Sequence, residues 1–127
     1  MAAYSMTTIP SRMSAPPMIC SAPSTSPSAR YAVTAAKAGS FGNVEVGIIP
    51  AFVHIGCAGG SIKESPIALG AQDVYFEKNG AFTGEVSGPM LKAAGCAYVI
   101  VGHSERRQFF GETDATVLQR TQAALEH

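Results

Sequence analysis

A histidine follows one of the most apolar stretches of the chain. Residues 99–107 read VIVGHSERR, in which Gly102 and His103 separate an apolar run from four polar residues. In parallel α/β folds, catalytic groups lie where a strand ends and the next loop begins. A helix that starts at Ser104 would hold His103 at the positive end of its dipole and disfavour protonation of the imidazole. A neutral imidazole can donate a hydrogen bond that polarises a carbonyl oxygen. The same position also suits a histidine that only hydrogen-bonds to nearby backbone, so position alone leaves both interpretations open.

A second unusual stretch, EKNGAFTGEVS at 77–87, precedes this histidine. Gly80 and Gly84 predict a tight turn that presents Phe82 and Thr83 at the tip of a long loop. An exposed aromatic side chain on such a loop indicates a partner surface. The alternative is that Phe82 folds back onto its own domain.

The sequence predicts no metal ion, nucleic acid or membrane as a partner. His54 and Cys57 have no further ligand at a usable spacing, so the sequence predicts no metal site. Lys plus Arg and Asp plus Glu number nine each, and a net charge of zero creates no field that attracts nucleic acid or an anionic membrane. No apolar run approaches the ~20 residues that span a bilayer.

Three apolar runs predict strands, at 44–49, 67–76 and 97–101, the second one interrupted by Gly70. The connections between them are too long for hairpins. Strands that read as near-continuous apolar runs and alternate with helical segments are typical of parallel βα units. The sequence therefore predicts an α/β fold with a parallel sheet.

Two helices are predicted behind the strands. Ser87 as N-cap, Pro89 in the first turn and Gly95 as a stop signal bound the first. The second would bury one apolar stripe at the chain end, made of Val117, Leu118, Thr121, Ala124 and Leu125. The connection 52–66 predicts at most a short helical stretch.

Residues 1–42 differ in composition from the rest. Ser, Ala, Pro, Thr and Met dominate the segment, and Glu45 is the first acidic residue. Such a segment buries too little apolar surface to offset about 1 to 2 kcal/mol per residue of backbone ordering, which predicts a low-complexity, disordered leader. Its Ser-rich, acid-free composition also suits an organellar transit peptide.

Residues 70–114 closely resemble the triosephosphate isomerase family. Two motifs, NGAFTGE and GHSERR, carry the resemblance and are separated by one helix and one strand. It extends more weakly upstream through VEVGIIPAFVHI and downstream to the chain end, and so covers roughly residues 43–127. Residues 1–42 show none of it.

The resemblance implies a (β/α)8 barrel, of which residues 43–127 would form a part. It also implies an obligate homodimer that interconverts dihydroxyacetone phosphate and glyceraldehyde 3-phosphate through an enediolate, in glycolysis and gluconeogenesis, without metal or cofactor. Because the family is glycolytic, the expected location is the cytoplasm, or an organelle if residues 1–42 are a transit peptide.

The resemblance also implies roles for single residues. His103 matches the neutral electrophilic histidine, and Glu105 matches the acidic residue that helps to hold the catalytic lysine. Thr83 matches the tip of the loop that enters the partner subunit, so that Phe82 and Gln72 become interface candidates as well.

The resemblance also covers the neighbours of these residues. Asp73 stands where the family often has Asn, and Arg106 and Arg107 match ion-pair partners of the motif.

Several parts of the family's machinery have no counterpart in this sequence. No strand carries the substrate-binding lysine, no glutamate takes the place of the general base, and the phosphate-binding loops are missing, so no substrate-binding residue is identifiable. Glu105 and Glu112 are not expected to act as the base. We therefore expect an incomplete barrel that does not turn over alone. The alternative is a non-catalytic fragment that associates with a complementary fragment or an intact subunit through its strand edges.

Overall fold

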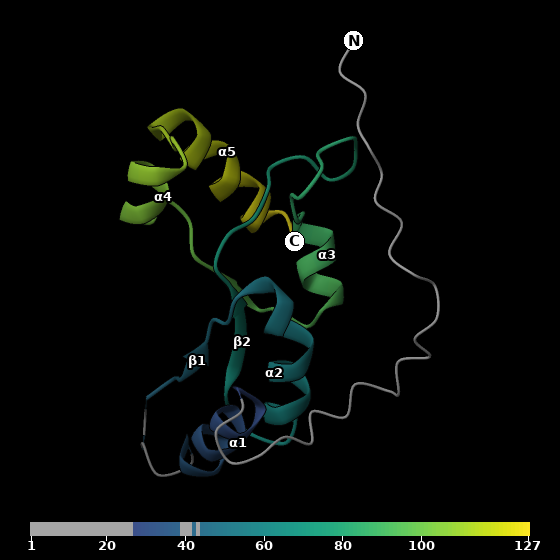
Figure 1. Ribbon diagram of the computed structural model, residues 1–127, viewed down its shortest axis with the longest axis vertical. Helices are drawn as coiled ribbons and strands as arrows, with labels where there is room; N and C mark the ends of the chain where they lie inside the picture. Colours follow the sequence, from purple (N-terminus) through teal and green to yellow (C-terminus); the bar gives the residue numbers. More distant parts are fainter. Residues whose placement is uncertain (1–26, 39–41, 43) are drawn as a thin grey trace, which may run out of the picture.

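The computed structural model describes residues 27–38, 42 and 44–127. In chain order they form α1 (Pro27–Ala38), β1 (Gly47–Ile48), the 3-10 helix η1 (Phe52–His54), α2 (Ile55–Ile62), β2 (Ala68–Ala71), α3 (Gly88–Ala93), β3 (Tyr98–Val99), α4 (Ser104–Phe109) and α5 (Asp114–Leu125). Figure 1 shows α1 and α2 beside the strands at the lower end of the molecule, and α4 and α5 at the opposite end.

The sheet has three parallel strands in the order β1-β2-β3, which confirms the predicted parallel α/β architecture. Gly47 pairs with Ala68, and Gly70 pairs with Tyr98. The regular strands are shorter than the apolar runs that predicted them, because only the paired part of each run is counted as strand. Among the described residues, β1 and β3 each have a neighbour on one side only, so both are edge strands.

The apolar core lies between α2 and the sheet. Ile55, Ala58 and Ile62 share one face of α2 and are buried against Leu69 of β2. The sequence analysis predicts that Gly70 interrupts the second strand, but β2 runs through this residue without a break. A Cβ at this position would lie 3.1 Å from Ile49 Cγ1 and 3.1 Å from the Tyr98 carbonyl oxygen, so a glycine is what the close approach of the strands allows.

Helix α1 differs from the prediction of a disordered segment over residues 1–42. Pro27 stands at its start, where proline is tolerated, and neither glycine nor proline follows within the helix. Tyr31 and Ala35, one turn apart, pack against the core cluster. The composition argument fails here because it averaged this Ala-rich stretch with the prolines before it. Residues 1–26, 39–41 and 43 lie outside the described residues, and so does that part of the predicted leader.

Helix α3 confirms the predicted helix after Ser87. Pro89 lies in its first turn, and Gly95 after its end has φ +88°. The Ser87 side chain is buried but does not make the expected capping hydrogen bond.

Helix α5 matches the predicted stripe only in part, since Val117, Thr121 and Ala124 are partly buried. Arg120 and Ala123 are its buried residues, whereas Leu118 and Leu125 are 58% and 83% exposed. The apolar stripe was therefore wrong for these two leucines. Periodicity identifies an amphipathic helix but cannot tell which face the rest of the chain covers.

Candidate active site

His103 lies just beyond the carboxyl end of β3, where the sequence analysis placed it, and takes the N-cap position of α4. Its Nδ1 accepts a hydrogen bond from the backbone N–H of Glu105 at 3.2 Å. A ring nitrogen that accepts a hydrogen bond carries no proton, so the proton of the neutral ring is on Nε2. The imidazole is half exposed and has one N–H to donate outside its own loop.

Gly102 fixes the backbone that leads into this cap. Its φ is +68°, and a Cβ there would lie 3.0 Å from Val117 Cγ1 on α5. Its carbonyl oxygen accepts a hydrogen bond from Arg107 Nε at 3.1 Å. A side chain at this position would strain the backbone and push against α5, which makes glycine the residue that fits.

The side chain of Glu105 points into solvent more than into the site. Its Oε2 lies 3.9 Å from His103 Nδ1, too far for a hydrogen bond, and the side chain is 74% exposed. No lysine of the described residues pairs with it, so the partner that the resemblance implies is not part of this site.

His103 borders a hollow of about 340 Å³ that also takes in Gln72 just after β2, Arg106 of α4 and Phe110 just after α4; the full lining is Gln72, Ile100, His103, Glu105, Arg106 and Phe110. Gln72 is tied to the end of β1, since its Nε2 donates to the Ile49 carbonyl oxygen at 3.2 Å. The hollow thus combines an imidazole N–H donor, a guanidinium and a carboxylate. Of these groups, the N–H donor can polarise a carbonyl group of a bound ligand.

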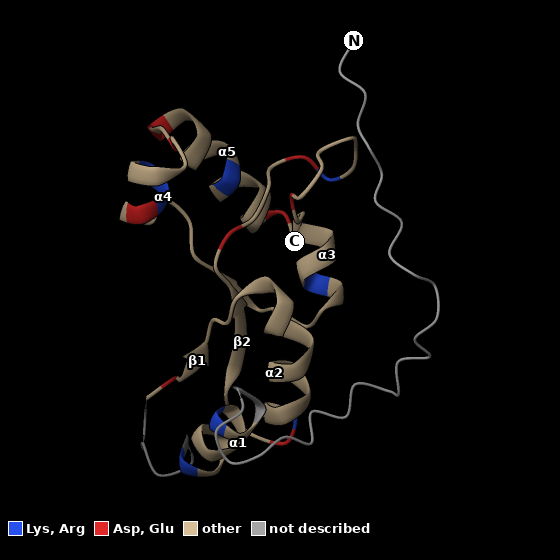
Figure 2. Ribbon diagram, in the orientation of Figure 1, with Lys and Arg blue, Asp and Glu red and all other residues tan. Residues whose placement is uncertain are grey.

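Figure 2 shows charged residues on α4, on α5 and on the segment after β2, whereas α2 carries none. Four charged residues form what we call the ion network: Asp73, Arg106, Glu112 and Arg120. Arg120 Nη1 donates to both Asp73 carboxylate oxygens at 3.0 Å, and Arg106 Nη2 lies 2.9 Å from Asp73 Oδ2. Burial raises the pKa of Asp73, and the guanidinium groups of Arg120 and Arg106 oppose this effect.

Glu112 is the second carboxylate of the ion network and contacts both of its arginines. Its Oε1 accepts from Arg106 Nε at 2.6 Å and lies 3.1 Å from Arg120 Nε. Sequence reasoning identified Arg106 as an ion-pair partner but missed the network roles of Glu112 and Arg120. Arg120 itself could have revealed the network. It lies on the same face of α5 as Ala123, and a charged side chain on the buried face of a helix indicates a buried partner of opposite charge.

The loop at 77–87 has features of both predicted alternatives. The Phe82 ring packs on Tyr75, with ring centroids 4.9 Å apart, and still leaves 40% of the residue exposed. Thr83 at the tip is exposed. The two flanking glycines have φ +140° and +93° and make the tight turn that the sequence predicts.

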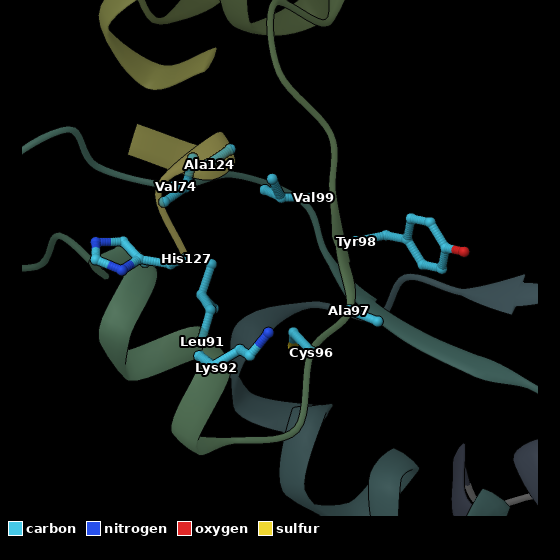
Figure 3. Close-up of a pocket in the computed structure, with 10 residues that line it drawn as sticks. Val74, Leu91, Lys92, Cys96, Ala97, Tyr98, Val99, Ala124 and His127 are labelled. Atoms are coloured by element: carbon cyan, nitrogen blue, oxygen red, sulfur yellow. The ribbon is translucent and has the colours of Figure 1, made fainter. Parts of the chain in front are cut away.

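Figure 3 shows a second, smaller hollow between α3 and the end of α5, of about 70 Å³. Its lining includes Lys92, Cys96 and His127. Cys96 is free and buried, and burial raises the pKa of its thiol. A raised pKa disfavours the thiolate, so these groups do not form an activated nucleophile.

Residues 27–38, 42 and 44–127 offer neither a metal-binding cluster nor a membrane-spanning helix. No three His, Cys, Asp or Glu side chains in this part lie close enough together to hold a metal ion. No helix of the same part is both long and apolar enough to cross a membrane.

The family model of triosephosphate isomerase matches residues 24–127. The match begins upstream of residue 43, where the sequence analysis placed the start of the resemblance. It therefore includes α1, which agrees with the packing of this helix on the core and corrects the statement that residues 1–42 share nothing with the family.

Curated proteins named triosephosphate isomerase are similar to this chain. That of Solibacter usitatus is 58% identical over 82 residues, which are 65% of this chain and 33% of the relative. That of Chlorobium chlorochromatii is 56% identical over 91 residues, 72% of this chain and 36% of the relative. That of Acaryochloris marina is 65% identical over 63 residues, 50% of this chain and 26% of the relative.

The chain spans about a third of the length of the first two of these relatives. The family match covers α1 through α5, and the strands it includes are parallel and joined by helices. On this evidence the chain belongs to the triosephosphate isomerase family and forms part of that family's (β/α)8 barrel.

Proposed function

We propose that this chain supplies the electrophilic part of a triosephosphate isomerase site, which interconverts dihydroxyacetone phosphate and glyceraldehyde 3-phosphate through an enediolate. The observation that carries the proposal is the hydrogen bond from Glu105 N–H to His103 Nδ1, which leaves Nε2–H as the donor. A neutral N–H donor stabilises the negative charge that develops on a substrate carbonyl oxygen when a proton is removed from the neighbouring carbon.

Glu105 has a supporting role in this proposal. Its backbone N–H orients the histidine, and its exposed carboxylate is free to meet a lysine supplied by another part of the barrel. A carboxylate within reach of a lysine holds the ammonium group in place through a charge-assisted hydrogen bond. No metal or cofactor takes part.

Proton abstraction needs a positioned base, and the described part of the site offers none. Glu112 is excluded from this role, because both guanidinium groups of the ion network engage its Oε1. We therefore expect no turnover from the 127-residue chain alone in a coupled isomerase assay. A rate typical of the family would contradict this expectation.

A chimeric enzyme tests the proposed role of His103. The 82 residues of this chain that align with the Solibacter usitatus relative replace the corresponding segment of that relative, which supplies the rest of the barrel. The chimera should isomerise triose phosphates, and His103→Gln should lower its kcat about 100- to 1,000-fold, as expected for the loss of one preorganised donor. His54→Gln, in η1, is the matched control. Equal activity of the His103→Gln chimera and its parent would refute the proposed role.

We further propose a homodimer in which the loop at 77–87 enters the partner subunit. Thr83 is exposed at its tip, Phe82 keeps 40% of its surface uncovered, and Gln72 lines the hollow beside His103. In the chimera, Phe82→Asp should shift the sedimentation coefficient from dimer to monomer, because it places a charge in an apolar contact. Unchanged dimers at micromolar concentration would count against this interface.

The alternative function is that of a non-catalytic fragment that associates with a complementary barrel fragment or an intact subunit. It is favoured by the two edge strands and by the exposure of Val44 before β1 and of Tyr98 in β3, at 65% and 48%. Edge strands with exposed apolar neighbours pair readily with other chains. Size-exclusion chromatography of the chain alone and mixed with intact relative enzyme tests this function, and a monodisperse monomer in both runs would reject it.

The proposed location is the cytoplasm, since the reaction is glycolytic. An organelle is the alternative if residues 1–42 act as a transit peptide. A fluorescent fusion of residues 1–42 that stays diffuse in the cytosol of a host cell would support the first, and enrichment in an organelle would support the second.

A further inference from the structure

Helix α4, which carries His103 at its N-cap, is not placed by apolar packing. It has no buried residue, and Phe109 and Phe110 at its end are each 69% exposed. Apolar burial normally fixes a helix of this length, because six residues form too few hydrogen bonds to be stable alone. The position of α4 must therefore come from polar contacts.

The ion network supplies the buried ones among those contacts, whereas the Arg107–Asp114 ion pair, at 2.7 Å, lies on the surface with Asp114 95% exposed. Arg106 is the residue of α4 that enters it, and its guanidinium lies between Asp73, just after β2, and Glu112, before α5. The Arg106 side chain is 21% exposed, whereas the carboxylates of Asp73 and Glu112 are 7% and 2% exposed. The contacts are thus largely removed from solvent, where charge-assisted hydrogen bonds are little screened.

Arg120 of α5 completes the arrangement. Its Nη1 donates to Asp73 and to the Val74 carbonyl oxygen, and its Nε lies 3.1 Å from Glu112 Oε1. Each carboxylate therefore faces both guanidinium groups. With two negative and two positive groups, the network is neutral as a whole.

Charge balance makes Asp73 and Arg120 depend on each other. If Asp73 were Asn, two guanidinium groups would share one carboxylate, and a buried positive charge would be left over. If Arg120 were neutral, two buried carboxylates would share Arg106 alone. A buried charge without its partner is strongly unfavourable, whereas replacing both partners removes that cost.

We propose that Asp73 and Arg120 are a matched pair of positioning residues that set the place of α4, and with it the His103 imidazole, relative to the end of β2. Asp73 acts through Arg106 and touches no ligand itself. The value of this placement for catalysis rests on the proposed isomerase function, but the placement can be measured without substrate.

Nuclear magnetic resonance of the histidine rings tests the proposal in the 127-residue chain. The chain has three histidines, so His54 and His127 serve as internal references for His103. Asp73→Asn and Arg120→Gln should each shift the His103 ring signals and leave those of His54 in place. In the double variant Asp73→Asn/Arg120→Gln, the His103 signals should return most of the way to their wild-type positions. Its unfolding equilibrium constant should lie roughly tenfold closer to wild type than the product of the two single changes predicts.

Leu91→Ala is the matched control, because it opens a cavity under α3 outside the ion network. It should destabilise the chain but leave the His103 signals unchanged. If Leu91→Ala shifts His103 as much as Asp73→Asn does, the network is merely structural and the proposal is wrong. If a single variant does not fold, the double variant decides: a folded chain with wild-type His103 signals supports the matched pair, and an unfolded chain or displaced signals overturn it. Because turnover is not the readout, failure here is distinct from failure of the isomerase proposal, which the chimera tests.

Discussion

Between α2 and β2, Ile62 and Leu69 are buried among other apolar side chains, and no charged residue belongs to that core cluster. Around α4 the reverse holds, since the helix buries no residue and Arg106 joins it to two buried carboxylates. Apolar packing tolerates small shifts of position, whereas ion pairs and hydrogen bonds depend on distance and direction. The difference indicates that non-directional apolar burial holds the core, whereas directional ion pairs both hold α4 and orient the site it carries.

The largest expected effect follows from breaking the ion network on one side. Arg120→Gln should lower the free energy of unfolding by about 3 to 5 kcal/mol, because it leaves buried carboxylates short of a partner. Urea denaturation measures this change. A loss below about 1 kcal/mol would mean that the network contributes no more than an exposed ion pair.

The same variant should acquire a pH dependence with a definite sign. Arg120 lowers the pKa of Asp73, so its removal raises the folded-state pKa further above the ordinary value of 3.8. A carboxyl group whose pKa is raised in the folded state costs no stability below its unfolded pKa and costs most above its folded pKa. The difference from wild type should therefore grow as the pH rises from about 4 to 7. A difference that shrinks over this range would contradict the assignment.

A core substitution sharpens the comparison from the other side. Leu69→Ala should cost about 3 kcal/mol through lost burial and the cavity it leaves. The loss should be independent of pH, and the signals of His103 should stay at their wild-type positions. Displaced His103 signals in a folded Leu69→Ala chain would show that the core, too, orients the site.

A smaller loss of stability is expected at Gly102, which connects β3 to α4. Gly102→Ala should cost about 2 kcal/mol, because it adds a side chain at φ +68° with Val117 only 3.0 Å away. Gly111→Ala is the control, with a similar φ of +69° and no atom within 4 Å of the added Cβ. The first variant should shift the His103 ring signals and the second should not. Equal shifts would indicate backbone strain alone.

The smallest effect is expected outside both regions. Lys78 and Glu126 form an ion pair at 2.9 Å with both side chains more than half exposed. Because solvent screens such pairs, Lys78→Gln should leave the urea midpoint unchanged within error. A clear shift would mean that surface charges matter as much as the buried network.

What the sequence could predict was local. Gly102, His103 and the helix from Ser104 are neighbours in the chain, so their types alone indicated a strand end followed by a helix cap. Asp73 and Arg120 are far apart in sequence, and nothing local pairs them. Their contact depends on how β2 and α5 meet in space.

The errors have similar causes. Helix α1 was missed because composition was averaged over 1–42, although the propensity of its Ala-rich residues was readable. Leu118 and Leu125 were placed in the core because periodicity cannot show which face another element covers. For Phe82 the sequence alone allows two interpretations, and in the structure its ring packs on Tyr75 and stays partly exposed.

The most direct test of the central claim is a long-range proton–nitrogen spectrum of the histidine rings at pH 8, above the ordinary histidine pKa of ~6.5. The claim is that the loop after β3 holds His103 as a neutral donor through Nε2, with Nδ1 accepting from Glu105. The expected spectrum shows the His103 proton on Nε2 and an unprotonated Nδ1. A ring with its proton on Nδ1, or on both nitrogens, would contradict the account.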